Sequence, residues 1–154
     1  MATYKGKQLS ASRSAFMQAF GNAISEDDTT EVITALLAVS DTVDLIRIAG
    51  GTRLQELFTY GPDLDTSTTL AVKIGYRKVD GGGVLTDDDD YFGSGLTNFQ
   101  AAVVGSAPTR YAFLPITFNE DVFITLTVTT AATSTAITTG YITTVARGKA
   151  VGTK

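Results

Sequence analysis

The chain has 154 residues, of which 44% are hydrophobic and 18% charged, and it carries a net charge of −4 with no His, Cys or Trp. This length and apolar content suit one folded domain. The absence of His and Cys removes the side chain that titrates near neutral pH and the thiolate nucleophile or metal ligand. We therefore expect a structural or binding protein, not an enzyme, and no cofactor.

Charge is divided unevenly along the sequence. Residues 1–25 and residues 122–154 each carry a net charge of +3 and contain no acid, whereas residues 26–121 contain sixteen acids and six bases. A negative body repels nucleic acid, and neither a signal peptide nor a membrane-spanning stretch is visible. We expect no nucleic acid and no membrane as partners. The basic ends either dock on an acidic partner, including another copy of this chain, or are solubilising tails.

The first 30 residues do not read as part of a sheet. Phe16 and Phe20 are four residues apart and would share one face of a helix. A short helix over residues 11–20 and an extended arm with two apolar anchors are both compatible with this spacing.

An acidic run at residues 25–28 reads as a solvated boundary after this segment. We therefore predict an extended N-terminal arm over residues 1–30 and a β-sandwich domain over residues 31–154.

Eight candidate strands follow, separated by turns rich in Gly, Asp, Ser and Pro. They occupy residues 31–39, 42–49, 53–60, 68–77, 98–104, 111–118, 121–130 and 136–148. Residues 79–90 contain three consecutive glycines and are expected to form a long loop. Pro115 places its strand at an edge or a bulge.

Two of these segments alternate with a period of two residues, which is typical of half-buried strands. In the first, Leu70, Val72, Ile74 and Tyr76 take one face, and Ala71, Lys73 and Gly75 take the other. In the second, Val122, Ile124, Leu126 and Val128 alternate with Phe123, Thr125 and Thr127. Eight short strands at near-regular spacing predict an all-β fold, a β-sandwich of the jelly-roll type.

The densest cluster of possible metal ligands is the run of four aspartates at residues 87–90. Carboxylate oxygens suit Ca²⁺, which makes Asp87, Asp89 and Asp90 the candidate ligands. Consecutive side chains point in different directions, however, and the spacing of an EF-hand is absent. The commoner alternative is a solvated loop tip, and we expect no bound metal.

A second acidic pair, Asp63 and Asp65, follows Gly61 and Pro62. It is a weaker calcium candidate, because Asp side chains after such a pair commonly bond to nearby backbone amides in a turn.

Aromatic and arginine side chains near strand ends are candidates for contacts between subunits. They are Tyr91, Phe92, Arg110 and Tyr111. Such residues are typical interface anchors, and the alternative is packing at the edge of the core.

The order of several motifs resembles that of small structural proteins of tailed bacteriophages, of the head decoration (cement) type. The motifs are Tyr4–Gly6, DTVDLIRIAGGTRL (Asp41–Leu54), LDTSTTLAVKIGYR (Leu64–Arg77), DDDDYF (Asp87–Phe92), DVFITLTVTTAA (Asp121–Ala132) and a closing Gly-Tyr-Ile strand. The resemblance covers about residues 41–145.

The resemblance implies a virion protein, made in the host cytoplasm, that binds the outer surface of the head and clamps neighbouring capsid subunits. The implied partners are the major capsid protein and copies of the chain itself, most simply in a homotrimer. In the arm, basic side chains would meet acidic patches of the shell, and aromatic ones would fill apolar notches. These residues are Tyr4, Lys5, Lys7, Arg13, Phe16 and Phe20.

Two other classes of function stay open from the sequence. One is a carbohydrate- or receptor-binding module of a tail fibre or baseplate, since jelly rolls host such sites. The other is a tail-tube or head-completion protein, which differs mainly in its symmetry.

Overall fold

The computed structural model describes residues 3–5, 23–31, 33, 35–80, 83–100, 108–134 and 140–152. These residues form strands and no helix, which confirms the all-β prediction. The strands are β1 (Thr3–Lys5), β2 (Ala23–Thr29), β3 (Thr42–Ile48), β4 (Thr52–Tyr60), β5 (Ala71–Lys78), β6 (Asp88–Leu96), β7 (Thr109–Arg110), β8 (Ile116–Phe118), β9 (Val122–Thr130) and β10 (Thr143–Ala150). The helix considered for residues 11–20 lies outside the described residues.

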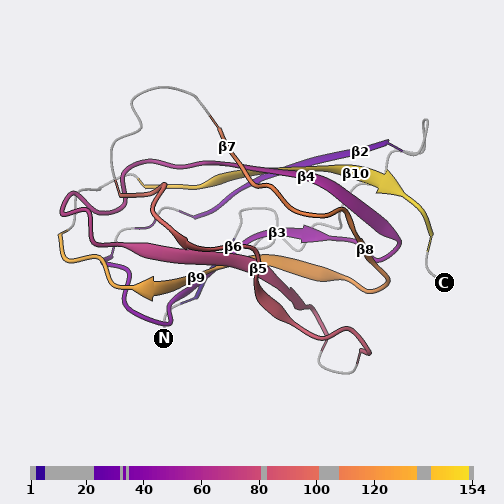
Figure 1. Cartoon of the computed structure of the whole chain (residues 1–154), viewed down its shortest axis with the longest axis horizontal. Coiled ribbons are helices and arrows are strands. Elements are labelled where there is room, and N and C mark those ends of the chain that lie inside the picture. Colours follow the sequence, from indigo (N-terminus) through magenta and orange to yellow (C-terminus); the bar gives the residue numbers. More distant parts are fainter. Residues whose placement is uncertain are drawn as a thin grey trace.

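The strands form two facing sheets (Figure 1). The β3 sheet has the order β1-β3-β9-β5-β6, and the β4 sheet has the order β2-β10-β4-β7, with β8 also paired to β4. Antiparallel pairing joins β2 to β10, β3 to β9, β4 to β7 and β8, and β5 to β6. Along the chain, each of these pairs lies inside the one named before it, and successive pairs belong to opposite sheets. This is the wrapped hairpin of a jelly roll, as predicted.

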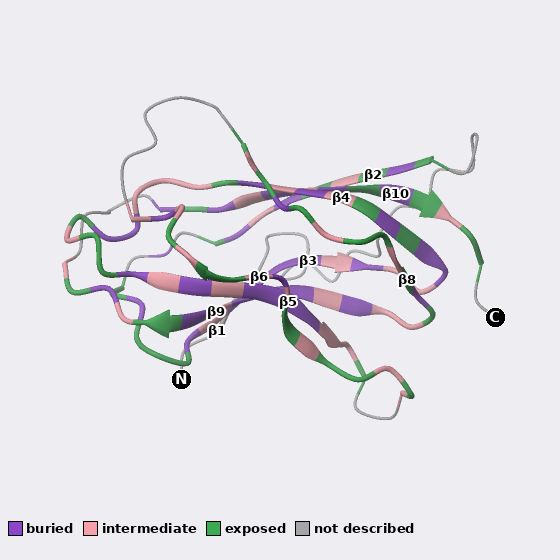
Figure 2. Ribbon diagram, viewed as in Figure 1, coloured by how far each residue is buried: buried purple, intermediate pink, exposed green. Residues whose placement is uncertain are grey.

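The core fills the space between the two sheets. The predicted alternation in β5 and β9 is confirmed, because Val72, Ile74, Ile124 and Leu126 are buried while Lys73 on the opposite face is partly exposed. Figure 2 shows the same alternation along β4 and β5. Complete burial of one such aliphatic side chain stabilises the fold by about 1.5–3 kcal/mol, so the facing rows hold the layers together.

Two strands lie inside the segment that was expected to be outside the sheets. β1 pairs in parallel with β3, and β2 pairs with β10 along its whole length. The expectation that residues 1–30 stay outside the sheets is therefore wrong for these two strands. Their short or charged sequences lack the apolar alternation of a central strand, and both are edge strands, where such residues are tolerated. An arm formed by the residues between β1 and β2 stays a prediction.

Two further local predictions are wrong. The aspartates at 88–90 begin strand β6 instead of capping a loop, because an edge strand can keep polar side chains in water. The described residues among 31–39 form no strand, and Ile33 makes an isolated bridge to Gly140. The chain passes here from the β4 sheet to the β3 sheet, and Leu37 is buried in the core. Pro115 immediately precedes β8, which pairs only with β4, so the edge position predicted there is confirmed.

Asp121 holds two turns together at one end of the sandwich. Its carboxylate accepts a hydrogen bond of 2.8 Å from the backbone N–H of Gly50, in the β3–β4 turn, and one of 2.5 Å from Arg47. Burial alone would raise the pKa of Asp121, but the bonds from Gly50 and Arg47 and the positive charge of Arg47 outweigh it and lower the pKa. The carboxylate therefore stays ionised and ties β3 to the start of β9.

Candidate functional site

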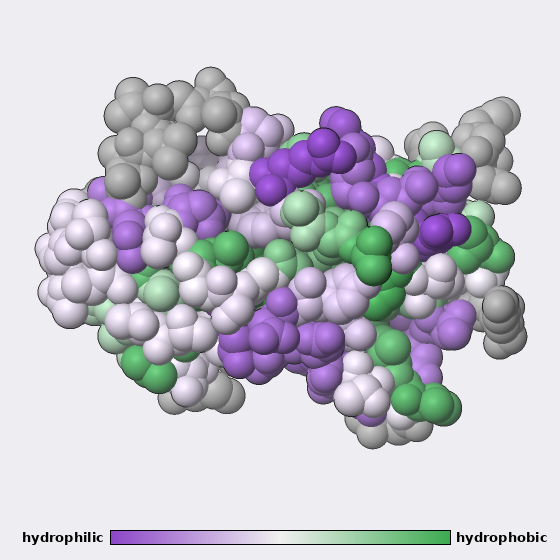
Figure 3. Space-filling view, in the orientation of Figure 1, coloured by the Kyte–Doolittle hydropathy of each residue, from purple (hydrophilic) through white to green (hydrophobic). Residues whose placement is uncertain are grey.

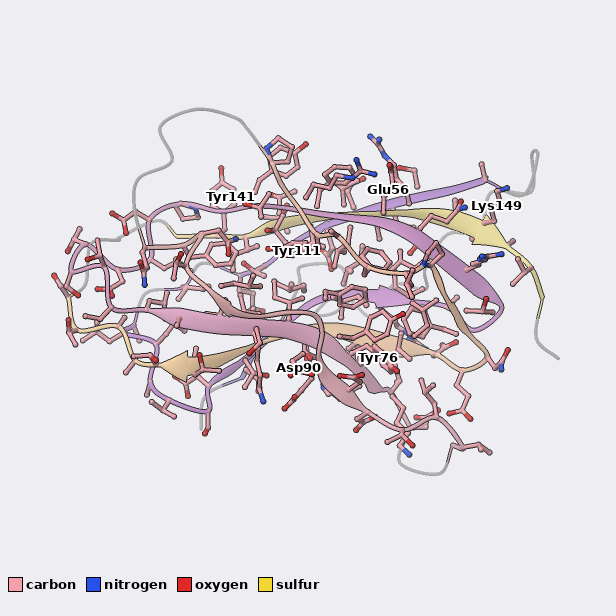
Figure 4. All side chains as sticks on the ribbon, in the orientation of Figure 1. Glu56, Tyr76, Asp90, Tyr111, Tyr141 and Lys149 are labelled. Atoms are coloured by element: carbon pink, nitrogen blue, oxygen red, sulfur yellow. The ribbon has the colours of Figure 1, made fainter. Side chains whose placement is uncertain are left out.

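Charged side chains are distributed unevenly over the surface. The outward face of the β4 sheet carries the exposed bases Arg53, Arg110, Arg147 and Lys149. The free edge of the β3 sheet carries the aspartates of β6. Figure 4 shows Glu56 and Lys149 on the upper layer and Asp90 below the lower one. The molecule therefore presents a basic face and an acidic edge, an arrangement suited to charged protein partners.

Glu56 binds two arginines on the basic face. Its carboxylate accepts a hydrogen bond of 3.1 Å from Arg110 and lies 3.7 Å from the Nη1 of Arg147. Both guanidinium groups lie beside the ring of Phe58, at 6.0 and 5.5 Å from its centroid. Because both arginines are more than half exposed, solvent and salt weaken the two ion pairs. Their outward N–H donors have the geometry to bind a partner's carboxylate.

A β-bulge in β4, where Gln55 is the extra residue, places this cluster on the outward face. The register between β10 and β4 shifts between Arg147 and Gly148, which leaves Arg147 opposite Glu56. A Cβ at position 148 would lie 2.3 Å from the carbonyl oxygen of Arg53, so only glycine fits there. A groove of about 550 Å³ beside the cluster is lined by residues of β2, β4, β7 and β10 and by Pro115.

The aspartate run does not form a converging set of ligands. The carboxylate of Asp89 lies 2.5 Å from the Nζ of Lys73, and Asp87 accepts a hydrogen bond of 2.9 Å from the backbone N–H of Lys78. Asp90 is exposed. In the described part of the chain, no three acidic side chains are grouped to hold a metal ion. The run is better described as an acidic edge than as the calcium site considered from the sequence.

A second groove, of about 670 Å³, crosses the outward face of the β3 sheet beside this acidic edge. Arg77 lies in it and donates hydrogen bonds of 2.8 and 3.3 Å to the buried carboxylate of Asp44, while its guanidinium covers the ring of Phe123 at 4.5 Å. Because Asp44 neutralises Arg77 and Lys73 neutralises Asp89, the charge of the groove comes from Asp87 and Asp88, and it is suited to a basic partner.

The four predicted subunit-contact residues divide into two pairs. Phe92 and Tyr111 are each only 4% exposed, so they are core residues of this chain and not surface anchors. Their positions at strand ends did not reveal that they point inward. Tyr91 is half-buried and Arg110 is exposed, so contact with another subunit stays a prediction for these two.

Tyr111 lies between the layers (Figure 4). Its hydroxyl bonds to the Thr59 hydroxyl at 2.6 Å and accepts a hydrogen bond of 3.2 Å from the Asn98 amide. Burial raises the pKa of Tyr111, and these two bonds only partly offset it. The phenol is therefore a neutral structural group.

The predicted contact residues of the arm fall mostly outside the described residues. Tyr4 and Lys5 belong to β1, which borders β3. Lys7, Arg13, Phe16 and Phe20 lie outside the part of the chain that the structure describes. Their role in contacting a partner stays a prediction.

Sequence reasoning missed two carboxylates that face the interior. Glu26 and Asp28 alternate with exposed residues along β2 and lie on the same side as the buried Ile24. Burial raises the pKa of the Glu26 carboxyl from 4.5 to about 7. The only signal in the sequence was the spacing Ile-x-Glu-x-Asp, which the acidic character of residues 25–28 concealed.

In the described residues, no helix combines the length and hydropathy that crossing a membrane requires.

The sequence matches no protein-family model and no curated protein. Solved structures do resemble the fold. A chain of the structure described as "Capsid of Ralstonia phage GP4" aligns over 99% of this chain and 100% of its own length, with a TM-score of 0.74 and 16% identity. A chain of "Cyanophage Pam1 capsid asymmetric unit" aligns over 88% and 91%, with a TM-score of 0.64 and 18% identity.

A chain of "Acidic stable capsid structure of Helicobacter pylori bacteriophage KHP30" aligns over 82% of this chain and 86% of its own, with a TM-score of 0.54 and 11% identity. At these identities the likeness is one of fold. The jelly roll described above is thus found in chains of three phage capsid structures.

Proposed function

We propose that this chain is a structural protein of a phage virion. The observation that carries the proposal is the end-to-end alignment with a chain of a phage capsid structure, at 99% and 100% coverage. Full coverage on both sides means that the match concerns the whole molecule and not a common pair of hairpins. The role is a passive one, based on contact with other proteins, and catalysis is not part of the proposal.

Within the particle, the proposed role is that of a decoration (cement) protein on the outer head surface. A sandwich with matched apolar rows supplies a rigid body, and its charged surfaces supply contacts to neighbours. Many weak contacts per copy become strong attachment when they act together across a shell. The partners in this proposal are the major capsid protein and other copies of the chain, arranged as a homotrimer.

The contact to the shell is assigned to the arm and to the basic face. Arg147 keeps exposed donors beside Glu56, and an arginine of this kind binds carboxylates in a bidentate manner. The segment between β1 and β2 adds Lys7 and Arg13, which would meet the same acidic surface, and Phe16 and Phe20, which would fill apolar notches. An acidic patch of the capsid protein is therefore the expected partner chemistry.

The test measures binding of the purified full chain to heads assembled without it. In the arm variant, Lys7 and Arg13 are changed to Glu, and Phe16 and Phe20 to Ser, while β1 and β2 keep their sequences. We expect wild-type protein to saturate the heads at hundreds of copies and the arm variant to bind at least 100-fold more weakly.

A control variant carries a charge reversal and the loss of an apolar side chain away from both the arm and the basic face: Lys78→Glu, at a half-buried position, and Val84→Ser, at an exposed one. It should bind like the wild type. If the arm variant still decorates heads at full occupancy, the assignment of the shell contact to the arm is wrong. If the wild type binds glycans and not heads, the alternative of a tail receptor-binding module is correct.

A further inference from the structure

The hydrophobic core reaches the surface along one side of the sandwich. Apolar side chains that pack on the core but stay partly exposed all come from β6, from β8 or from the segments beside them. They are Leu85, Tyr91, Leu96, Phe113 and Ile116. β6 ends the β3 sheet, and β7 and β8 end the β4 sheet, so among the described strands none lies over this side.

Leu114 extends this surface outward. Its side chain is 82% exposed, although the nearby Phe113 and Ile116 pack on the core. Its backbone carbonyl accepts a hydrogen bond of 2.9 Å from the hydroxyl of Tyr91. Phe92 packs edge-on against both Tyr91 and Phe113, with centroid distances of 5.2 and 4.8 Å. The backbone at Leu114 is therefore held against an aromatic cluster, which lowers the backbone entropy lost on binding.

This apolar band, defined as the five residues above together with Leu114, has opposite charges on its two sides. Arg110 lies on the side of the β4 sheet, and Asp90 lies on the side of the β3 sheet. In Figure 3, a hydrophobic strip crosses the middle of this face with hydrophilic groups on both sides. An apolar centre between charged rims is the usual anatomy of a protein interface, and an exposed apolar patch of this kind commonly marks one.

We propose that the apolar band is the surface through which copies of this chain associate with one another. The charge pattern favours a second copy of the chain as the partner of the band. If the two copies are related by a rotation axis that runs parallel to the band, the apolar residues of one copy lie against those of the other. The same rotation brings the arginine side of each copy beside the aspartate side of the next. An axis perpendicular to the band and lying in the interface would instead oppose like charges.

This relation holds for any closed ring about such an axis. It therefore fits the homotrimer of the proposed function, on which this inference rests only for the number of copies. Leu114 would lie nearest the axis, and Arg110 of one copy would approach Asp90 of its neighbour. A partner with a uniformly charged surface would satisfy only one side of the band.

The test is the mass of the purified full chain in solution, measured by light scattering over a range of concentrations. We expect an oligomer for the wild type and a single chain for Leu114→Asp, with at least a 100-fold rise in the dissociation constant. Val84→Asp is the matched control, because Val84 is 95% exposed and lies outside the band, and it should keep the wild-type mass. Since Leu114 is exposed, its variant should stay folded, with a thermal midpoint of unfolding lowered only by the stabilisation that association gives the wild type.

A charge exchange tests the arrangement of the rims. Arg110→Asp and Asp90→Arg should each weaken association, and the double variant should recover most of the loss. A monomeric wild type at every concentration, or a Leu114→Asp variant with the wild-type mass, overturns the inference. Failure of the proposed function has a different signature, since the chain could then associate through Leu114 and still be absent from particles.

Discussion

The carboxylate of Asp65 accepts a hydrogen bond of 2.7 Å from the backbone N–H of Leu70, the residue that precedes β5. The same buried carboxylate also accepts bonds from the backbone and hydroxyl of Thr69, both at 2.8 Å, and from the Ser67 hydroxyl at 2.5 Å. Burial alone would raise the pKa of Asp65, but these bonds outweigh it and hold the pKa well below its usual range. One side chain thus fixes the β4–β5 connection.

We predict that Asp65→Asn destabilises the fold. The amide cannot accept all of these donors, and a buried donor left without an acceptor is costly. The thermal midpoint at neutral pH should fall by about 5–10 °C. Asp63→Asn is the matched control, because Asp63 accepts one backbone bond, from Asp65, and an asparagine oxygen can replace it.

The acid dependence of this effect follows from the lowered pKa. Asp65 contributes its stability above its unfolded pKa of about 4, and that contribution is lost as the pH falls toward the folded value. The gap in thermal midpoint between wild type and Asp65→Asn should therefore narrow below about pH 4. A gap that is constant with pH would contradict an ionised Asp65.

Glu26 is predicted to make the fold less stable as the pH rises, the opposite of the effect of Asp65. Its folded pKa of about 7 lies above the ordinary value of 4.5, so the folded state holds its proton where the unfolded state has lost it. Stability should fall as the pH rises from about 4.5 to 7 and then level off. At about 1.4 kcal/mol for each pKa unit the full shift would give about 3.5 kcal/mol, and because Glu26 is only partly buried, solvent screening makes the expected loss smaller than this.

The measurement is urea unfolding of wild type and Glu26→Gln between pH 4.5 and 8. The neutral amide should remove this part of the pH dependence and make the variant the more stable protein at pH 8. If the two proteins show parallel curves of unfolding free energy against pH, the buried carboxyl does not titrate as described.

Gly75 is predicted to be essential for the path of β6. A Cβ built on it would lie 2.1 Å from the carbonyl oxygen of Asp88 and 2.3 Å from the carbonyl carbon of Asp89. Because the obstacle is backbone, Gly75→Ala must push β6 away from β5, and the free energy of unfolding should fall by about 1–3 kcal/mol. Lys73→Ala, on the same outward face, removes only a partly exposed ion pair and should cost less than about 1 kcal/mol. Equal stability of Gly75→Ala and wild type would contradict the close approach of the β6 backbone to Gly75.

The sequence predicted the elements in which local pattern and burial agree. The apolar side chains of β5 and β9 alternate along the sequence, since each strand has one face on the core, although Gly75 and Thr125 on the other face are also buried. Pro115 indicated an edge position, because proline has no backbone N–H to donate to a neighbouring strand. The aspartate after Gly61 and Pro62 was expected in a turn, and Asp65 holds one.

The features that the sequence could not predict depend on pairing between strands that are far apart in the chain. Glu56 meets Arg147 only because β4 and β10 pair with a bulge, and nothing local to either residue signals this. The acids of β2 and β6 were assigned to solvent on composition, whereas their strands are edges that tolerate charge. Phe92 and Tyr111 were ambiguous between core and surface until the two sheets were placed face to face.

The central claim, that this chain works as a repeated component of a phage particle, is tested most directly by its copy number. Particles purified from the phage that encodes the chain would be analysed by quantitative mass spectrometry against the major capsid protein. We predict hundreds of copies of the chain in each particle. Its absence from purified particles, or only a handful of copies in each, would contradict the assignment to the head surface.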